Sequence, residues 1–454
     1  MAPPGPIAAW GREIVHRQGV TWQWSPAAAP DRRRGGGTAA AYAEPVERVI
    51  TRRLGLVDAV VIGLGSMLGA GVFAAFAPAA AAAGTGLLVG LGLAGLVAFC
   101  NATSSARLAA RYPVFGGSYV YGREVLGPWA GFFAGWAFIV GKTASAAAMA
   151  LTFAAYAVPE AWVKPVAVLA VAALTLVNTR GVTRTAAVTR VLVTVALLAL
   201  AVVVAIGGTA TPAGVAWRAS EWTVAGVLQA AAFLFFAFAG YARIATMGEE
   251  VSDPERTIPR AITIALILVL VIYAVVGFVA LRVLGPDGLA GSAAPLAEVA
   301  ATAGEPWVGV VAVGAAAAAL GALLALVAGI GRTAVAMART GDLPRWLAAL
   351  HPRFEVPQRA ELVLGAVVCV LVLATDLRGA IGFSSFGVLL YYFVANAAAF
   401  RAPGPGRLAR VLPAVGALGC LALAAALPLA SVAGGLVVLA AGLLYRLVRV
   451  RLVR

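Results

Sequence analysis

The chain has 454 residues, of which 62% are hydrophobic and 12% are charged, and its mean hydropathy is +0.94. This composition leaves too little polar surface for a soluble globular protein and is typical of a chain that crosses a membrane many times. The formal net charge of +15 is explained by attraction of loop arginines to anionic lipid headgroups, and we expect no nucleic-acid partner.

Residues 1–50 form the first predicted segment. They are rich in Pro, Ala, Gly and Arg, include the run Arg32-Arg33-Arg34, and show no apolar periodicity. This composition predicts a disordered cytoplasmic tail. Because no apolar core like that of a secretory signal precedes Leu54, we expect the first span to act as its own insertion signal.

Twelve apolar stretches follow the tail. A helix needs about 20 apolar residues to cross a hydrocarbon core of about 30 Å. Runs such as 195–206 are continuously apolar, whereas the strands of a membrane barrel alternate apolar and polar residues. The sequence therefore predicts an all-α integral membrane protein with twelve spans, at about 56–83, 85–106, 127–157, 161–178, 188–208, 224–247, 261–284, 308–338, 360–375, 379–400, 411–428 and 430–448.

Arginine placement predicts the orientation of these spans. If the N-terminus is cytoplasmic, 29 of the 34 Lys and Arg residues fall on the cytoplasmic side, and Lys142 lies within a span. Cytoplasmic loops carry an excess of Lys and Arg in membrane proteins. We therefore predict a multi-pass protein of the cytoplasmic membrane with both termini in the cytoplasm.

The first predicted span contains a glycine-rich stretch, Gly63 to Ala74, with glycines at positions 63, 65, 69 and 71. Each glycine costs roughly 1 kcal/mol in a helix interior, so this stretch favours an opening of the backbone. Inside a membrane, open backbone is tolerated only where it lines a cavity or is buried in protein. The freed N–H and C=O groups would form a polar site at mid-depth, as in transporters of small charged solutes.

A second interruption is predicted in the sixth span, at Phe238-Ala239-Gly240. The two interrupted spans are five helices apart. Interrupted helices in equivalent positions of successive five-helix units indicate an inverted repeat with its ligand site between them.

The sequence around these breaks resembles the amino acid-polyamine-organocation superfamily. The stretch at 65–73, Gly-Ser-Met-Leu-Gly-Ala-Gly-Val-Phe, is similar to the first-helix signature of that superfamily. The stretch at 236–241, followed by Glu249-Glu250-Val251 and 258–262, resembles its sixth-helix signature. Residues 331–353, with Met-Ala-Arg-Thr-Gly-Asp-Leu-Pro at 337–344, resemble the segment after its eighth helix. With the twelve spans, the resemblance covers about 52–450.

The resemblance implies a leucine-transporter-type fold. A ten-helix transport core would span 51–400, with inverted repeats at about 51–208 and 222–400, and 401–454 would add two helices and a short cytoplasmic C-terminus. It also implies a permease, a secondary transporter that moves amino acids or related amines by alternating access. The implied substrate-binding residues are Gly65, Ser66, Met67, Gly69, Ala70, Gly71, Phe236, Ala237, Phe238, Ala239 and Gly240.

Within this set, the resemblance assigns the substrate carboxylate to N–H groups around Gly69, Ala70 and Gly71. The substrate ammonium would bind carbonyls of 65–67 and 236–239. A half-helix that begins near Gly71 points its positive end at an anion, which agrees with this assignment. The absence of side chains at the glycines lets a ligand approach the backbone.

Three further residues are candidates for gating or coupling. Phe236 occupies the position of the superfamily's aromatic gate, although neighbouring phenylalanines are equally aromatic. Lys142 lies midway along the third span, where a charge is costly and needs a partner or a purpose; proton coupling, a structural pair and snorkelling are its alternatives. Arg243 could attract an anionic substrate group, pair with Glu249 in a cytoplasmic gate, or reach the headgroups.

Asp58, Glu249 and Glu250 are interface charges or members of a cytoplasmic latch.

The sequence departs from the superfamily at one position. Many proton-coupled members carry a lysine in the fifth helix, and the corresponding position here is Ala196. The eighth span offers no Ser or Thr from Ala315 to Gly331 to bind sodium. Proton-coupled transport through Lys142, exchange and uniport therefore remain alternatives.

Two other classes of protein compete with a transporter. A membrane enzyme acting on lipids would need a nucleophile and base or an acidic metal cluster, and no such set is found in the sequence, so we expect no enzyme activity, no cofactor and no metal. A transporter-like sensor would need a signalling domain, and the tail at 1–50 contains none that we recognise. The expected partners are a small amino acid or amine, the lipid bilayer and, for a coupled carrier, protons.

Overall fold

The computed structural model describes residues 54–112, 116–181, 186–214, 222–245, 251–402 and 406–453. The predicted disordered tail at 1–50 and the predicted latch residues Glu249 and Glu250 lie outside these residues. The described part is helical and contains no strand. Its α-helices are α2 (Leu56–Met67), α3 (Ala70–Ala74), α4 (Phe76–Ala83), α5 (Leu87–Arg111), α6 (Ser118–Leu126), α7 (Pro128–Ala157), α8 (Val163–Asn178), α9 (Ala186–Thr209), α10 (Val224–Phe238), α11 (Ala242–Ala245), α12 (Pro254–Gly291), α13 (Pro295–Ala301), α14 (Glu305–Arg339), α15 (Gln358–Ala374), α16 (Leu377–Arg401), α17 (Leu408–Ala426) and α18 (Leu429–Val453).

Helix boundaries follow local sequence signals. Asp376 caps α16 by accepting a hydrogen bond from the N–H of Gly379 at 2.7 Å, and Thr223 caps α10 in the same way. Both are side chains that favour the N-cap position. Gly285 has a φ of 70° and precedes Pro286, which divides α12 into two helical pieces. Proline and a left-handed glycine together interrupt a helix at that point.

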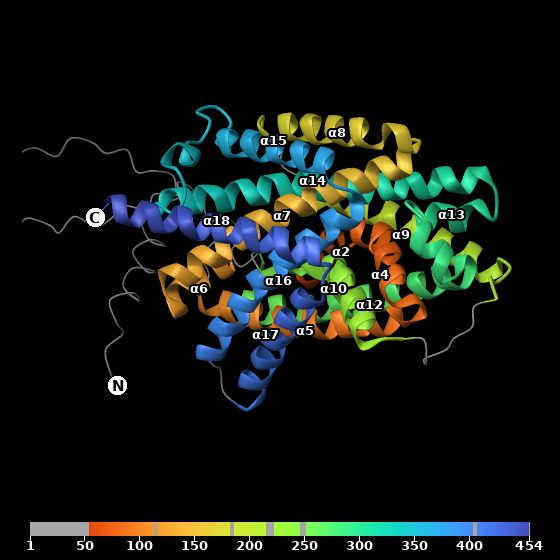
Figure 1. Ribbon diagram of the computed structural model, residues 1–454, viewed down its shortest axis with the longest axis horizontal. Helices are drawn as coiled ribbons and strands as arrows, with labels where there is room; N and C mark the ends of the chain where they lie inside the picture. Colours follow the sequence, from red (N-terminus) through yellow and green to blue (C-terminus); the bar gives the residue numbers. More distant parts are fainter. Residues whose placement is uncertain are drawn as a thin grey trace, which may run out of the picture. The chain divides into compact units, whose positions relative to one another are not determined.

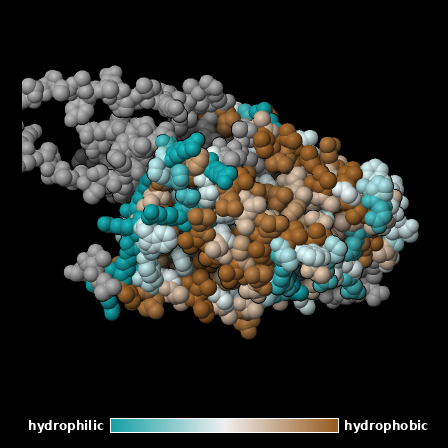
Figure 2. Space-filling view, turned by 90° about the horizontal axis from the view of Figure 1, so that it is seen from above, coloured by the Kyte–Doolittle hydropathy of each residue, from teal (hydrophilic) through white to brown (hydrophobic). Residues whose placement is uncertain are grey.

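Among the described residues, eleven helices are long and apolar enough to cross a membrane. The chain is therefore a multi-pass membrane protein. The predicted span at 360–375 corresponds to α15, whose 17 residues extend about 26 Å at 1.5 Å per residue and fall short of the usual length. Figure 2 shows apolar residues over the middle of the displayed face and hydrophilic residues toward its ends.

Helix packing in the core follows a regular scheme (Figure 1). Helix α7 packs against α14 and α16, and α14 packs against α9. Helix α5 packs against α10, while α12 packs against α2 and α4. Helices α8 and α15 lie side by side at one edge of the bundle. This scheme places α3 and α10 in the interior, where their residues are mostly buried, and buries the end of α2 at Gly63, Leu64 and Met67.

Candidate functional site

The first predicted span is discontinuous between Met67 and Ala70. Helix α2 ends at Met67, and Leu68 has a ψ of 39°, outside the helical range. Gly69 is extended, with a ψ of −150°, and α3 begins at the next residue. The discontinuity lies within the glycine-rich stretch that predicts an open backbone. It removes Met67 C=O and Ala70 N–H from the regular helical hydrogen-bonding pattern.

The groups released at this break are bound by side chains from other helices. The hydroxyl of Tyr273 in α12 donates to the carbonyl of Met67 at 2.6 Å. The N–H of Ala70 donates to the sulfur of Met149 in α7 at 3.1 Å. Both contacts are buried, which satisfies backbone groups that would otherwise be costly in an apolar interior.

The sixth predicted span is distorted at Ala239–Tyr241, where α10 gives way to a single 3-10 turn before α11. Its carbonyls are also bound by side chains. Tyr273 donates to the carbonyl of Ala237 at 3.1 Å as well as to Met67, so one hydroxyl joins the two breaks. The Ala239 carbonyl accepts from Lys142 Nζ at 3.1 Å and from the Tyr392 hydroxyl at 3.5 Å. Several carbonyls predicted to hold a substrate ammonium are thus bound by the protein's own donors.

The two breaks touch each other. A Cβ added at Gly71 would lie 2.5 Å from the Cα of Ala237, and one added at Gly240 would overlap the carbonyl of Ser66. Only glycine permits this approach, because any side chain would force the backbones apart. The structure brings the predicted binding residues of the two spans together in a closed arrangement, and a ligand between them requires the helices to separate.

Lys142 lies in α7 with 7% of its surface exposed. Its ammonium contacts the second break through Ala239. Among the described residues, no carboxylate lies within ion-pair distance of its nitrogen. In the bundle interior the Lys142 nitrogen therefore donates to a neutral acceptor, the carbonyl of Ala239.

The other gating candidates lie near the same break. Phe236 is 5% exposed in α10, and its neighbours Phe235 and Phe238 make edge contacts with Tyr392 and Tyr273. Arg243 is half-buried in α11, while its predicted partner Glu249 lies outside the described residues. The roles assigned to Phe236 and Arg243 stay predictions. Asp58 pairs with Arg190 of α9 at 2.5 Å.

A small cavity of about 10 Å³ lies beside the first break, enough for about one water molecule. Ala196, which the sequence resemblance predicts to lie at or near the position of the superfamily's lysine, is among its lining residues. The residues around the cavity are apolar: Gly65, Leu68, Leu192, Val193, Ala196, Ala317 and Ala318. Sodium-like hard cations require several oxygen ligands, and none of these side chains supplies one.

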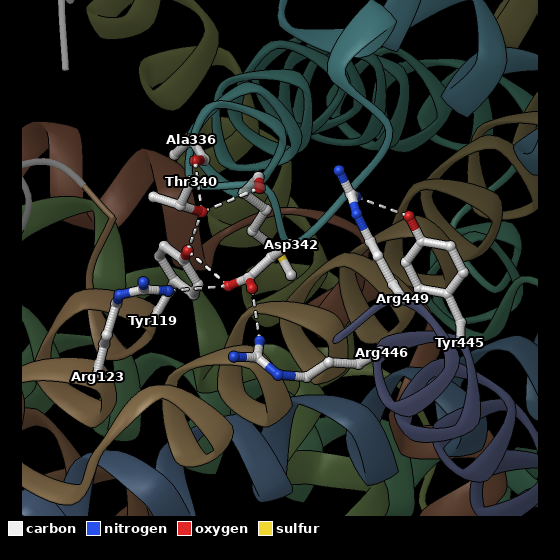
Figure 3. Close-up of polar contacts among 9 residues, drawn as sticks. Tyr119, Arg123, Ala336, Thr340, Asp342, Tyr445, Arg446 and Arg449 are labelled. Carbon is white, nitrogen blue, oxygen red and sulfur yellow. Dashed lines mark hydrogen bonds and ion pairs between the residues drawn. The ribbon is translucent and has the colours of Figure 1, made fainter. Parts of the chain in front are cut away.

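A polar network at one end of the bundle was not singled out by sequence reasoning (Figure 3). Asp342, in the loop after α14, accepts from Arg446 of α18 at 2.6 Å and from Arg123 of α6 at 3.2 Å. It also accepts from the Tyr119 hydroxyl at 2.8 Å, which in turn is 2.5 Å from the Thr340 hydroxyl. We call Tyr119, Arg123, Thr340, Asp342 and Arg446 the Asp342 network.

The Asp342 network is largely buried. The side chains of Asp342 and Arg446 are each 8% exposed, and the Arg446 guanidinium packs on the rings of Trp129 and Phe132. Burial, with the nearby Asp342 carboxylate, raises the pKa of Tyr119 to about 12. The hydroxyl therefore remains a proton donor at physiological pH, and the network fastens α6, α14 and α18 together.

Comparison with known proteins gives a consistent result. The profile of the amino acid permease family matches residues 58–401. An uncharacterized transporter of Mycobacterium tuberculosis is 59% identical over 400 residues, covering 87% of this chain and 90% of the relative. The chloroplastic cationic amino acid transporter 7 of Arabidopsis thaliana is 30% identical, covering 77% and 65%. The branched-chain amino acid permease BcaP of Bacillus subtilis is 26% identical, covering 72% and 75%.

Proposed function

Because the chain belongs to the amino acid permease family, as its sequence resemblance predicts, we propose that it is a secondary transporter that moves amino acids or related amines across the cytoplasmic membrane by alternating access. The family identifies a transporter of amino acids rather than an enzyme. The observation that carries the finer proposal is the contact between the two helix breaks, where backbone groups of both spans converge on one buried place.

The proposed site uses the backbone groups that the breaks expose. A substrate carboxylate would accept from N–H groups around Gly69, Ala70 and Gly71, and its ammonium would donate to carbonyls of 65–67 and 236–239. In the closed arrangement Met149, Tyr273 and Lys142 bind some of these groups. A substrate that enters would replace these internal contacts by equivalent ones, which keeps the buried polar groups satisfied throughout the exchange.

The helix pairings support a twelve-helix arrangement with inverted repeats at about 51–208 and 222–400. Counted by predicted span, helix three packs on ten, and helix eight packs on five. Helix one packs on seven, and helix six packs on two. When five is added to the first number and subtracted from the second, the pair three and ten becomes eight and five, and the pair one and seven becomes six and two. The pair of helices four and nine becomes itself. Two five-helix units related by a two-fold axis in the membrane plane produce such pairings.

We place both termini and the Asp342 network on the cytoplasmic side, because the arginine-rich ends of the spans lie there in the predicted topology. The two helices in 401–454 are accessory to the ten-helix core in this proposal. In alternating access, the Asp342 network and the closed contact between the breaks would then open one after the other.

Amino acid uptake into proteoliposomes tests the proposed function. Purified protein should take up at least one labelled amino acid, in counterflow against the same amino acid preloaded inside. The variant Gly240→Ala, which disrupts the closed contact between the breaks, is the negative control. Absence of counterflow for all twenty amino acids and for simple amines would contradict the proposal.

Uptake should not depend on sodium. The cavity beside the first break is lined by apolar side chains only, so we expect replacement of Na⁺ by choline to change the initial rate by less than about twofold. Sodium independence is expected of a second candidate, an exchanger or uniporter without ion coupling, and equally of proton coupling through Lys142, which stays a prediction. A strict sodium requirement would contradict the inference that this apolar cavity does not bind sodium.

A further inference from the structure

The charge of Lys142 has a consequence for the kind of amino acid that the site accepts. Lys142 and Lys164 are the two lysines of the chain. Lys164 is exposed and donates to the carbonyl of Leu373, whereas Lys142 is buried and donates to the carbonyl of Ala239. A buried ammonium without a neighbouring carboxylate is costly. The position therefore favours a ligand that brings negative charge.

The helices packed against α7 offer little to neutralise this charge. In the described residues, α3, α8, α16 and α18 contain no acidic residue. Helix α6 contains Glu124 and α14 contains Glu305 at its first position, and no ion pair joins either to Lys142. Glu361 of α15 is buried, but it lies against Gly331 of α14, and no ion pair joins it to Lys142. The described residues around Lys142 thus supply no carboxylate within ion-pair distance of its nitrogen.

The bonding partner of Lys142 belongs to the proposed ammonium site. Ala239 is among the residues whose carbonyls would hold the substrate ammonium. A substrate with a basic side chain would add a second cation to its own ammonium, and this second cation would repel Lys142 at close range. A substrate whose side chain carries a carboxylate would instead pair with Lys142 and bring the net charge of the occupied site to zero.

Polar hydroxyls lie next to Lys142 on the same side of α7. Ser145 is one helical turn from Lys142, and positions three apart share a helix face. Its hydroxyl lies 2.6 Å from the hydroxyl of Ser384 in α16. A carboxylate at Lys142 would therefore find neutral hydrogen-bond donors within one turn, which a purely apolar side-chain pocket would lack.

We propose that Lys142 selects the charge of the substrate, so that the site takes amino acids with an acidic side chain and rejects those with a basic one. This inference rests on the proposed function, because it assumes that the two helix breaks hold the amino acid. Lys142 acts here as a specificity residue, by pairing with the side-chain carboxylate in place of the Ala239 carbonyl.

Ligands of nearly equal shape and different charge test the proposal. Binding of L-glutamate, L-glutamine and L-lysine is measured by calorimetry on purified full-length protein, and counterflow is measured with the same ligands. We expect the parent protein to bind glutamate at least about tenfold more tightly than glutamine and about 100-fold more tightly than lysine. L-aspartate and L-asparagine form a second matched pair.

Three variants locate the effect. Lys142→Met keeps the length of the side chain and removes its charge, so the preference for glutamate over glutamine should fall to within about twofold. Lys142→Arg should keep the preference for acidic ligands, and Lys164→Met is the matched control that should leave every ratio unchanged. Should Lys142→Met fail to fold, as judged by size-exclusion chromatography, the ligand order of the parent protein still decides the question.

The outcomes separate this inference from the proposed function. Tighter binding of glutamine or lysine than of glutamate by the parent protein overturns the inference and leaves the transporter proposal standing. An undiminished glutamate preference in Lys142→Met also overturns it. Failure of the parent protein to bind or exchange any of the twenty amino acids overturns both.

Discussion

Gly240→Ala is expected to lower the rate of amino acid uptake by at least about 100-fold, because displacement of a functional site by about 1 Å can have an effect of that size. A Cβ at this position would overlap the carbonyl of Ser66 and approach the N–H of Met67. The clash is with backbone, which has no alternative rotamer to relieve it. The two helix breaks could then no longer make the closed contact that the proposed alternating access requires.

The matched control for this prediction is Gly92→Ala. Gly92 lies in α5, and a Cβ added there would meet nothing within 4 Å. Both variants add one methyl group at a glycine of a helical segment, so they share any general effect of the substitution. Uptake by Gly240→Ala at the rate of Gly92→Ala would show that the contact between the breaks is dispensable. Thermal unfolding in detergent should show that overpacking lowers the free energy of unfolding of Gly240→Ala by about 1–3 kcal/mol.

Asp342→Asn is expected to reduce the free energy of unfolding by about 3–5 kcal/mol, because it leaves the buried Arg446 guanidinium without its counter-charge. Asp342 also accepts from Arg123 and from Tyr119, so the substitution weakens the link between three elements at once. The loss can be measured by thermal or denaturant unfolding of the purified protein in detergent. Asp287→Asn, at an exposed position, is the control and should change stability by less than about 0.5 kcal/mol.

A second variant separates charge from packing in the Asp342 network. In the double variant Asp342→Leu with Arg446→Met, neither buried charge remains. Replacing both members of a buried ion pair by apolar residues is often neutral or stabilising. We therefore expect the double variant to be more stable than Asp342→Asn alone. Equal losses in both would mean that shape rather than charge holds α18 against the loop after α14.

Local sequence features predicted the main elements of the fold. Continuous apolar runs indicated helices, and the eleven apolar helices of the described residues coincide with predicted spans. The glycines of 63–71 indicated where the first span opens, because the cost of glycine in a helix is a local property. The break between Met67 and Ala70 lies among them. The predicted span at 360–375 lies close to α15, at Gln358–Ala374, although its 17 residues fall short of the usual length of a membrane span.

Features that depend on distant contacts could not be predicted in this way. Tyr273 reaches Met67 across 206 positions of sequence, and Lys142 reaches Ala239 across 97. The Asp342 network joins residues 104 and 219 positions apart. No periodicity or spacing connects such pairs. The sequence did indicate that Lys142 needs a partner within the membrane, since a charge at that depth is costly, but packing of α7 against the sixth span determines which group it binds.

The closed contact between the breaks was also beyond sequence reasoning. Glycines at positions 71 and 240 are consistent with a backbone that approaches either a ligand or another backbone. The structure shows the second of these, with Ala237 and Ser66 as the neighbours. In a transporter the same glycines are expected to contact the ligand when it is bound and the opposite backbone when it is absent.

A structure of the protein determined with a transported amino acid bound tests the central claim most directly. We predict ligand density between the two breaks, with its carboxylate within about 3.2 Å of the N–H groups of 69–71 and with Gly71 and Ala237 no longer in contact. Density elsewhere, for example in the groove of about 600 Å³ lined by Thr223 and Gln229, with the breaks still in contact, would contradict the account.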